Sequence, residues 1–395
     1  MIGGRGLRAL ASALAIVAFA WAMLASARIA LSRLLVKYGT TVADAAAIDA
    51  ATNLTPADAE AHYAGAALSS YQGKPIEALK EFEVAVNLRP RDYYLWLQLG
   101  MTRDQLDDAA GALSALNEAV RLAPFYSQPR WQRGNLLFRM GRYDEAFADL
   151  RKATTSNPEL LPSFIDLAWG ASGQDLKMME QIVQPQNDNA HLALARFFAT
   201  RKPAESIAQL KAVRNVPDQI RRDLIRQLLT AGAFQQAFEI WTDGKISRDA
   251  AKGRIYDGGF EGPLSLDEAG FGWRAAQGEA GLTLSLDANQ PHSGLRSLRA
   301  DFSGISNPGA HIVSQLVMVD RATHYQLNFA VRTRDVVSGG PPLITVSEPT
   351  GQRQQLARSA SLPQGTSGWR TASFDFTTGR STNGGRLTSV PAMSM

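Results

Sequence analysis

The pattern of apolar and polar residues changes twice along the chain. An uncharged apolar run comes first, a helical pattern with regularly spaced alanines and prolines follows, and short alternating runs begin after about Lys252. Runs with a period near 3.6 and runs with a period of two form different elements. We therefore expect a multidomain α plus β protein with segments 1–40, 45–245 and 254–378 and an irregular tail, 379–395.

The apolar run extends from Ala9 to Ala27 without a charged residue. As a helix it would be about 28 Å long, close to the thickness of the hydrocarbon core of a bilayer. Three interpretations remain open: an uncleaved transmembrane signal anchor, a signal peptide cleaved after Ala25-Ser26-Ala27, or a buried helix of a soluble domain. The run is long for a signal-peptide core, which favours the anchor.

The orientation of this anchor follows less directly from its flanks. Arg5 and Arg8 precede the run, and Arg28, Arg33 and Lys37 follow it, so the positive-inside count does not favour an inside N-terminus. A single N-terminal segment nevertheless most often translocates the chain that follows it. We therefore expect a single-pass protein with a translocated C-terminal body.

Proline and alanine recur with a period of 34 residues. Pro90, Pro124 and Pro158 mark this period. An alanine stands five and twelve residues before each proline, a bulky apolar residue eight before it and a small residue twenty-four before it. Such fixed-period identity is typical of a repeat array. We expect each unit to be two antiparallel helices, with small residues where the helices cross and proline after the second helix.

Residues 57–158 resemble tetratricopeptide repeats. One unit matches that family's pattern through Trp96, Leu99, Gly100, Ala112, Ala119 and Pro124. The next matches it through Gly134, Gly141, Tyr143, Ala146, Phe147, Ala153 and Pro158. The first unit departs from the pattern, with His62 and Gly65 where larger residues are usual. The resemblance implies an α-helical solenoid.

The resemblance also implies a concave groove lined by the first helix of each unit. The family's lining positions correspond here to Tyr63, Tyr71, Tyr94, Leu97, Met101, Asp104, Trp131, Asn135, Phe138 and Arg139. A surface this rich in aromatic residues suits a protein partner bound as an extended peptide or a helix. The alternative is that the aromatic residues pack against neighbouring units or the C-terminal domain.

Beyond Pro158 the register of the repeat blurs. The segment Gly232–Phe238 nevertheless echoes Gly141–Phe147, and helical patterns run through residues 191–200, 205–213 and 219–229. We expect degenerate helical hairpins from Glu159 to about Asp243 that complete the solenoid.

The last third of the chain is expected to be built from strands. Alternating runs bounded by Gly, Pro, Ser and Asn cover Leu282–Leu286, Ser297–Phe302, His311–Val319, Tyr325–Thr333, Leu343–Ser347 and Trp369–Thr377. Regularly spaced short strands with turns between them indicate an antiparallel β-sandwich.

Residues 255–378 resemble jelly-roll carbohydrate-binding modules. The resemblance is carried by the stretches Asp257–Gly262 and His292–Gly294 and by Gly368-Trp369. It implies that Asp257 and Glu261 help to hold a structural calcium ion and that Trp273 and Trp369 stack on sugar rings. For both tryptophans, packing in the core is the alternative.

The stretch after Thr378 departs from that resemblance. It has neither an aromatic residue nor strand alternation, where such a module closes with a further strand. We therefore expect an altered or truncated terminus that leaves a sheet edge exposed and weakens the calcium site.

Composition narrows the chemistry. The absence of cysteine excludes disulfides, zinc–thiolate sites and iron–sulfur clusters, and the 5 histidines include no pair at helical metal spacing. The 41 basic and 37 acidic residues are dispersed, which does not suggest a nucleic-acid partner. No phosphate-binding loop, zinc-protease motif or nucleophile elbow occurs. We expect no enzyme activity and no cofactor apart from the calcium ion.

Together these features predict a non-enzymatic, membrane-anchored scaffold that holds a protein partner. An anchor, repeats and a carbohydrate-module-like domain in one chain resemble bacterial envelope proteins of exopolysaccharide assembly or export. That resemblance implies a place in the bacterial inner membrane with a periplasmic body. The alternative is a glycan-binding or glycan-modifying protein that acts through the sandwich on a polysaccharide, with the repeats as a spacer.

Overall fold

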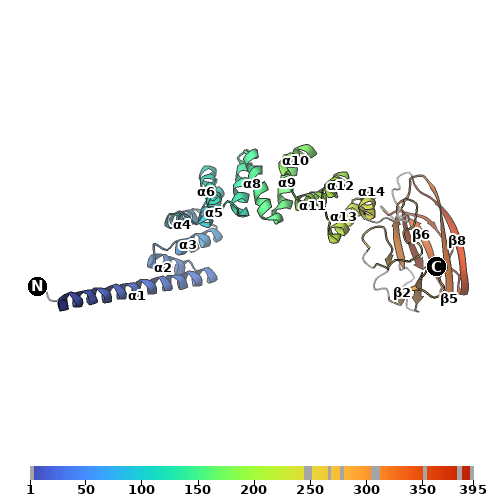
Figure 1. Ribbon diagram of the computed structural model, residues 1–395, viewed down its shortest axis with the longest axis horizontal. Coiled ribbons are helices and arrows are strands. Elements are labelled where there is room, and N and C mark those ends of the chain that lie inside the picture. Colours follow the sequence, from blue (N-terminus) through green and yellow to red (C-terminus); the bar gives the residue numbers. More distant parts are fainter. Residues whose placement is uncertain are drawn as a thin grey trace. The chain divides into compact units, whose positions relative to one another are not determined.

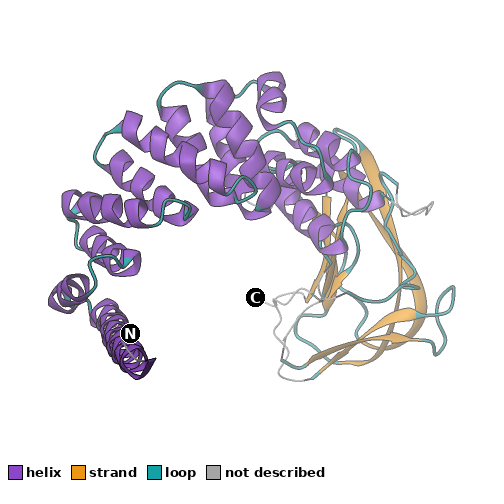
Figure 2. Ribbon diagram, turned by 60° about the vertical axis from the view of Figure 1, so that its left-hand side comes forward, coloured by secondary structure: helices purple, strands orange, loops and turns teal. Residues whose placement is uncertain are grey.

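The structure is a computed structural model that describes residues 4–243, 251–265, 268–275, 280–303, 312–349, 354–379 and 385–391. It divides into two compact units, Met1–Pro185 and Gln186–Met395. Figure 1 colours the chain along the sequence and labels many of its elements, and Figure 2 distinguishes helices from strands.

The first unit is helical in its described part. It begins with α1 (Gly4–Val42) and α2 (Ala45–Leu54) and continues with three helical hairpins. These are α3 (Ala59–Tyr71) with α4 (Pro75–Leu88), α5 (Tyr93–Gln105) with α6 (Ala109–Leu122), and α7 (Ser127–Arg139) with α8 (Tyr143–Ser156). The 3₁₀ turn η1 (Pro158–Leu160) leads into α9 (Leu161–Ala171) and α10 (Leu176–Val183).

The 34-residue period reappears in how the hairpins begin and pack. Asp58 and Asp92 each cap a first helix, accepting the backbone N–H of Glu60 and Tyr94. A Cβ atom added at Gly100 would lie 2.7 Å from Leu116 Cγ, and one at Gly134 would lie 2.9 Å from Leu150 Cγ. Small residues therefore stand where the two helices of a hairpin meet, as the spacing predicts.

Helix α1 has two parts with different surroundings. Its apolar first part is exposed, whereas Ser32, Val36 and Gly39 are buried against α2 and α3. Arg28 Nη2 donates to the carbonyl of Leu54 at 2.7 Å, and Ser32 Oγ donates to the carbonyl of Ala51. The helical array therefore begins inside the segment expected to be only anchor and juxtamembrane helix.

The stretch Leu10–Val42 of α1 is long and apolar enough to cross a membrane, by length and composition. A signal sequence passes the same test, so both of those interpretations stand. None of its most apolar window is buried, which does not fit the core helix of a soluble domain.

The second unit begins with two helical hairpins close to their expected positions. These are α11 (Asp188–Phe198) with α12 (Pro203–Lys211), and α13 (Asp218–Thr230) with α14 (Phe234–Thr242). The strands follow: β1 (Arg274–Ala275), β2 (Leu282–Asp287), β3 (Ser297–Phe302), β4 (Val313–Val317), β5 (His324–Val336), β6 (Pro342–Ser347), β7 (Gln355–Arg358), β8 (Gly365–Thr377) and β9 (Gly385–Pro391).

These strands form three sheets. One has five strands in the order β1-β4-β9-β6-β7, and the pairs β2–β3 and β5–β8 form two more. Every pair of named strands is antiparallel, which confirms the expectation of antiparallel strands in this region. The sandwich and its jelly-roll identity stay predictions.

The expectation of an irregular tail is wrong for residues 385–391. Strand β9 lies between two others, with Leu387 opposite Gln315 of β4 and Val346 of β6. It therefore fills the inside of the five-stranded sheet instead of leaving an edge there. The stretch lacks aromatic residues, and pairing on both sides supplies the order that its side-chain pattern does not indicate.

The last helical hairpin and the strand region share one hydrophobic core. Trp241 of α14 lies in one buried cluster with Phe271 and Met318 from the strand region and with Leu224 and Leu228 of α13, and its ring lies 5.7 Å from that of Phe271. Trp241 Nε1 donates to Glu268 Oε1 at 2.9 Å, and the same oxygen accepts the N–H of Gly270 at 2.8 Å. The boundary expected between 245 and 254 is therefore not a boundary between cores.

Candidate partner-binding face of the helical hairpins

The residues expected to line a groove come from α3, α5 and α7, and we call their common surface the first-helix face. Tyr71, Tyr94 and Arg139 are exposed. The half-buried members are Tyr63, Met101, Asp104, Trp131, Asn135 and Phe138. Nine of the ten expected residues thus remain at least partly accessible.

Two tyrosines join the first helices of the first two hairpins. The rings of Tyr63 on α3 and Tyr94 on α5 lie 5.8 Å apart and tilted by 58°. Burial, and then a hydrogen bond with the Tyr94 hydroxyl, raise the pKa of the Tyr63 hydroxyl above its usual range. Tyr63 therefore keeps a protonated hydroxyl within this aromatic surface.

An ion pair joins the next two first helices. Arg139 Nη2 of α7 lies 2.5 Å from Asp104 Oδ2 of α5. Both side chains are partly solvated, so the pair adds little stability by itself. It fixes a carboxylate and a guanidinium beside each other on the same face as the tyrosines.

Phe138 follows the packing alternative instead. Its ring lies 5.3 Å from that of Tyr143 and 6.0 Å from that of Phe147, both on the paired helix α8. Asn135 donates to the carbonyl of Trp131 within α7. Trp131 therefore remains the aromatic residue of α7 best suited to meet a partner.

Leu97 is not part of this face. It is fully buried in a cluster with Ala112, Leu116, Ala119 and Leu136, so its assignment to the groove is wrong. Its side chain packs instead among residues of α6 and α7, inside the helical array.

Sequence reasoning missed a set of aromatic residues beside this face. Tyr93 lies 6.4 Å from Tyr94 and 4.9 Å from Tyr126, measured between ring centroids, and Phe125 is 85% exposed. The rings of Tyr63, Tyr94, Tyr93 and Tyr126 thus form a continuous series of contacts. The sequence signal that could have revealed them is a pair of adjacent aromatic residues after each of two repeat prolines, Tyr93-Tyr94 after Pro90 and Phe125-Tyr126 after Pro124.

The predicted calcium ligands hold loops together. Asp257 Oδ1 and Oδ2 accept the N–H of Glu261 and Gly262 at 2.7 and 3.0 Å. Glu261 Oε1 accepts the N–H of Leu295 at 2.8 Å. No group of three acidic or histidine side chains converges among the described residues. These bonds give both carboxylates a structural role, and calcium binding stays a prediction.

The two tryptophans proposed for sugar stacking differ. Trp273 is buried, its ring stacks on Phe260 at 4.7 Å, and its Nε1 donates to the carbonyl of Asp257. It is a core residue, so the sugar-stacking assignment is wrong for it. Trp369 of β8 is half-buried and donates to the carbonyl of Gln290, with Arg332 over its ring and His292 at its edge.

A family model described as tetratricopeptide repeat matches residues 93–126 and 128–160. The chain contains tetratricopeptide repeats. The matched segments coincide with α5–α6 and with α7–η1, the two units in which the sequence keeps its clearest register. Tetratricopeptide repeats imply a scaffold for protein–protein interaction.

The relatives each match a limited part of this chain. The chain is 31% identical over 86 residues to DnaJ homolog subfamily C member 3 of Homo sapiens, a match that covers 22% of this chain and 17% of that protein. It is 30% identical over 122 residues to Protein FlbA of Caulobacter vibrioides, covering 29% of this chain and 20% of that protein. The matches thus span about a fifth of each relative's length.

The chain also aligns with solved structures. YrrB, titled a TPR protein with an unusual peptide-binding site, aligns at 24% identity and a TM-score of 0.34, over 41% of this chain and 88% of its own. MamA aligns at 18% identity and a TM-score of 0.36, over 41% and 95%. PilF of Pseudomonas aeruginosa aligns at 18% and 0.35, over 53% and 97%.

Proposed function

We propose that this protein is a membrane-tethered scaffold that holds a protein partner on the first-helix face and catalyses no reaction. The observation that carries the proposal is the linkage of consecutive first helices through Tyr63 with Tyr94 and through Asp104 with Arg139. These contacts hold aromatic rings and charged groups in one fixed surface.

The partner suited to this face is an extended peptide or an amphipathic helix. Aromatic side chains bury a large area at low cost in conformational entropy. A tyrosine hydroxyl can also donate a hydrogen bond to a peptide carbonyl or accept one from a peptide N–H. The Asp104–Arg139 pair offers both signs of charge to a partner's polar side. YrrB is described with a peptide-binding site of its own.

The test replaces exposed or half-buried rings of this face and leaves the core intact. Tyr94→Ala with Trp131→Ala is expected to weaken partner binding at least 10-fold in co-purification from native membranes. The matched control is Ile76→Ala with Val84→Ala on α4, which removes exposed apolar side chains from a second helix. Equal binding by both double variants, with equal thermal stability, contradicts the proposal.

We place the tether in the bacterial inner membrane and the body in the periplasm, in exopolysaccharide assembly or export. The tether is supported by the exposed apolar first part of α1, which continues without a break into the helix that packs on α2. The bacterial envelope and the exopolysaccharide role are proposed from the combination of an anchor, repeats and a strand region in one chain. Mass spectrometry of the mature protein tests the tether. A mature chain that begins at Arg28 contradicts it, because the apolar run is then absent.

A second function, binding of a polysaccharide, is favoured by the surroundings of Trp369. Arg332, His292 and Gln290 gather around this ring, and aromatic, basic and amide groups together are suited to sugars. Saccharide binding by the full chain that is lost in Trp369→Ala, but kept in Trp131→Ala, supports this function. Saccharide binding that persists in Trp369→Ala contradicts a sugar-binding role of this tryptophan.

A further inference from the structure

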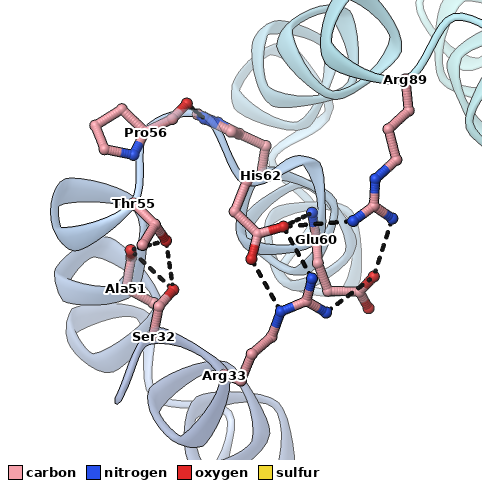
Figure 3. Close-up of polar contacts among 9 residues, drawn as sticks. Ser32, Arg33, Ala51, Thr55, Pro56, Glu60, His62 and Arg89 are labelled. Carbon is pink, nitrogen blue, oxygen red and sulfur yellow. Dashed lines mark hydrogen bonds and ion pairs between the residues drawn. The ribbon is translucent and has the colours of Figure 1, made fainter. Parts of the chain in front are cut away.

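One side of α1 is occupied by the first hairpin. Arg33 Nε lies 3.0 Å from Asp58 Oδ2, and Arg33 and Arg89 approach Glu60 at 3.7 and 3.6 Å (Figure 3). Ser32 Oγ accepts a hydrogen bond from Thr55 Oγ1 at 2.7 Å on the same side. These contacts fix which sides of the helix remain available for another partner.

A second side of α1 carries bulky apolar side chains in the open. Leu31, Leu34 and Tyr38 are 50, 64 and 56% exposed, although all three lie beyond the apolar run that ends at Ala27. Charged residues flank this side but do not interrupt it: at about 100° per residue, Arg28 lies about 60° from Leu31 and Lys37 about 60° from Leu34, and Arg28 is held by the carbonyl of Leu54. Exposed apolar groups outside a bilayer indicate a surface that another protein covers.

These residues belong to a seven-residue pattern that extends through the whole exposed helix. Steps of three and four residues in alternation connect Leu10, Ala13, Val17, Ala20, Leu24, Ala27, Leu31, Leu34, Tyr38 and Thr41, all of them exposed. A mean spacing of 3.5 residues keeps such positions along one seam of a left-handed helix pair. We call these ten positions the α1 seam.

The composition of the α1 seam changes where the apolar run ends. Within the run, Leu or Val alternates with Ala, and small residues let helix backbones approach closely inside a bilayer. Beyond it, Leu31, Leu34 and Tyr38 follow each other without a small residue, which suits pairing driven by the removal of apolar surface from water. The part of the seam within the apolar run is thus suited to helix pairing in lipid, and the part beyond it is suited to helix pairing in water.

The occupant that matches this seam is the same seam of another copy. Helices anchored in one membrane with one orientation are parallel, so each seam position meets its own counterpart, as in a parallel two-stranded coil. We propose that two copies of this chain pair in parallel along the α1 seam. This proposal rests on the proposed membrane tether, and it presents two first-helix faces side by side to a bivalent partner.

The absence of cysteine from the chain makes the test direct. Leu34→Cys and Tyr38→Cys lie on the α1 seam, and the matched controls Ile29→Cys and Lys37→Cys are exposed on the same stretch but off it. After oxidation of native membranes, we expect the disulfide-linked dimer fraction of the seam variants to be at least five-fold that of the controls. Each variant must stay in the membrane and keep the protease resistance of the wild-type body.

The outcomes separate the pairing from the tether. Equal cross-linking of seam and control variants, whether high or low, in protein that resists alkaline extraction from the membrane overturns the pairing and leaves the tether standing. Extraction of the wild-type protein by alkaline carbonate instead overturns the tether. Seam-specific cross-linking in membranes supports both.

Discussion

Trp96 and Arg130 make the same hydrogen bond in consecutive repeats, although one is an indole and the other a guanidinium. Trp96 Nε1 donates to the carbonyl of Pro90 at 2.9 Å, and Arg130 Nε donates to the carbonyl of Pro124 at 2.8 Å. Both donors and both acceptors are 34 residues apart. The same side-chain-to-backbone hydrogen bond is therefore present in both repeats, although the donor residue differs.

His62 occupies the same place in the first repeat. Its Nε2 lies 3.0 Å from the carbonyl of Pro56, and its Nδ1 lies 2.7 Å from Glu81 Oε2. The residues equivalent to Glu81 are Ala115 and Asp149, and Asp149 is held by Arg130 and Arg133. The second helix thus supplies an acid wherever the first supplies a basic side chain, and an alanine opposite the tryptophan.

The first prediction concerns replacing the Arg130–Asp149 pair of the third repeat by the tryptophan and alanine found at the equivalent positions of the second. Arg130→Trp alone leaves the Asp149 carboxylate, 4% exposed, with one partner fewer and is expected to lower the free energy of unfolding by about 2–3 kcal/mol. Arg130→Trp with Asp149→Ala is expected to lose at least about 1 kcal/mol less than the sum of the two single variants. A double-mutant cycle in urea measures this coupling, and strictly additive losses refute it.

The second prediction concerns the close approach of helices within a hairpin. Gly100→Ala pushes a methyl group into Leu116, so we expect a loss of about 1–3 kcal/mol of unfolding free energy. Gly170→Ala is the matched control, because this helical glycine in α9 has open space around it and alanine favours the helix by about 0.5–1 kcal/mol. Thermal unfolding should order the variants Gly170→Ala, wild type, Gly100→Ala. Equal melting temperatures contradict the packing described.

The third prediction concerns the core shared by α14 and the strand region. A Cβ atom at Gly270 would overlap the Trp241 indole, so Gly270→Ala is expected to lower stability by about 1–3 kcal/mol and to expose the tryptophan. Gly368→Ala on β8, which has open space, is the control. Trp fluorescence during unfolding and limited proteolysis report the change. If α14 and the strands then melt as before, the shared core is not a cooperative unit.

The fourth prediction follows from the raised pKa of Tyr63. The folded state holds this proton more tightly than the unfolded chain, so the resulting stability is complete below the ordinary tyrosine pKa near 10 and is lost as pH rises above it. Tyr63→Phe should therefore flatten the fall in stability above about pH 10, measured by urea unfolding. Tyr71→Phe, at a residue that is 85% exposed, is the matched control for loss of a tyrosine hydroxyl, and an equal effect of both variants contradicts the prediction.

The helical hairpins were predictable because their signals are local and repeated. Ala, Gly and Pro at fixed spacing mark helix crossings and helix ends, and Gly134 and Leu150 meet as that spacing requires. The continuation of α1 into the array was not predictable in the same way. Apolar residues occur both in the exposed part of α1 and in the part that packs on Ile48 and Ala51, so the sequence does not mark where one part ends and the other begins.

The strands were predictable where alternation is strong and not elsewhere. Residues 297–302 form β3 as expected, whereas β7 and β9 depend on pairing with β6, which no local pattern indicates. The strand expected at His311–Val319 is observed as β4 (Val313–Val317), and His311 itself lies outside the described residues.

The candidate site was predictable in outline only. Family spacing placed Tyr63 and Tyr94 on one face, but only tertiary structure separates the buried Leu97 from them.

The partner-binding claim is tested most directly by photo-cross-linking from defined positions in native membranes. A photoreactive residue at Tyr94, on the first-helix face, is compared with one at Ile76 on α4, both exposed. We expect Tyr94 to cross-link one partner, Ile76 to yield none, and the Tyr94 product to disappear when Trp131→Ala is added. Cross-links of equal yield from both positions, or a Tyr94 product that persists in Trp131→Ala, would contradict a scaffold that holds its partner on this face.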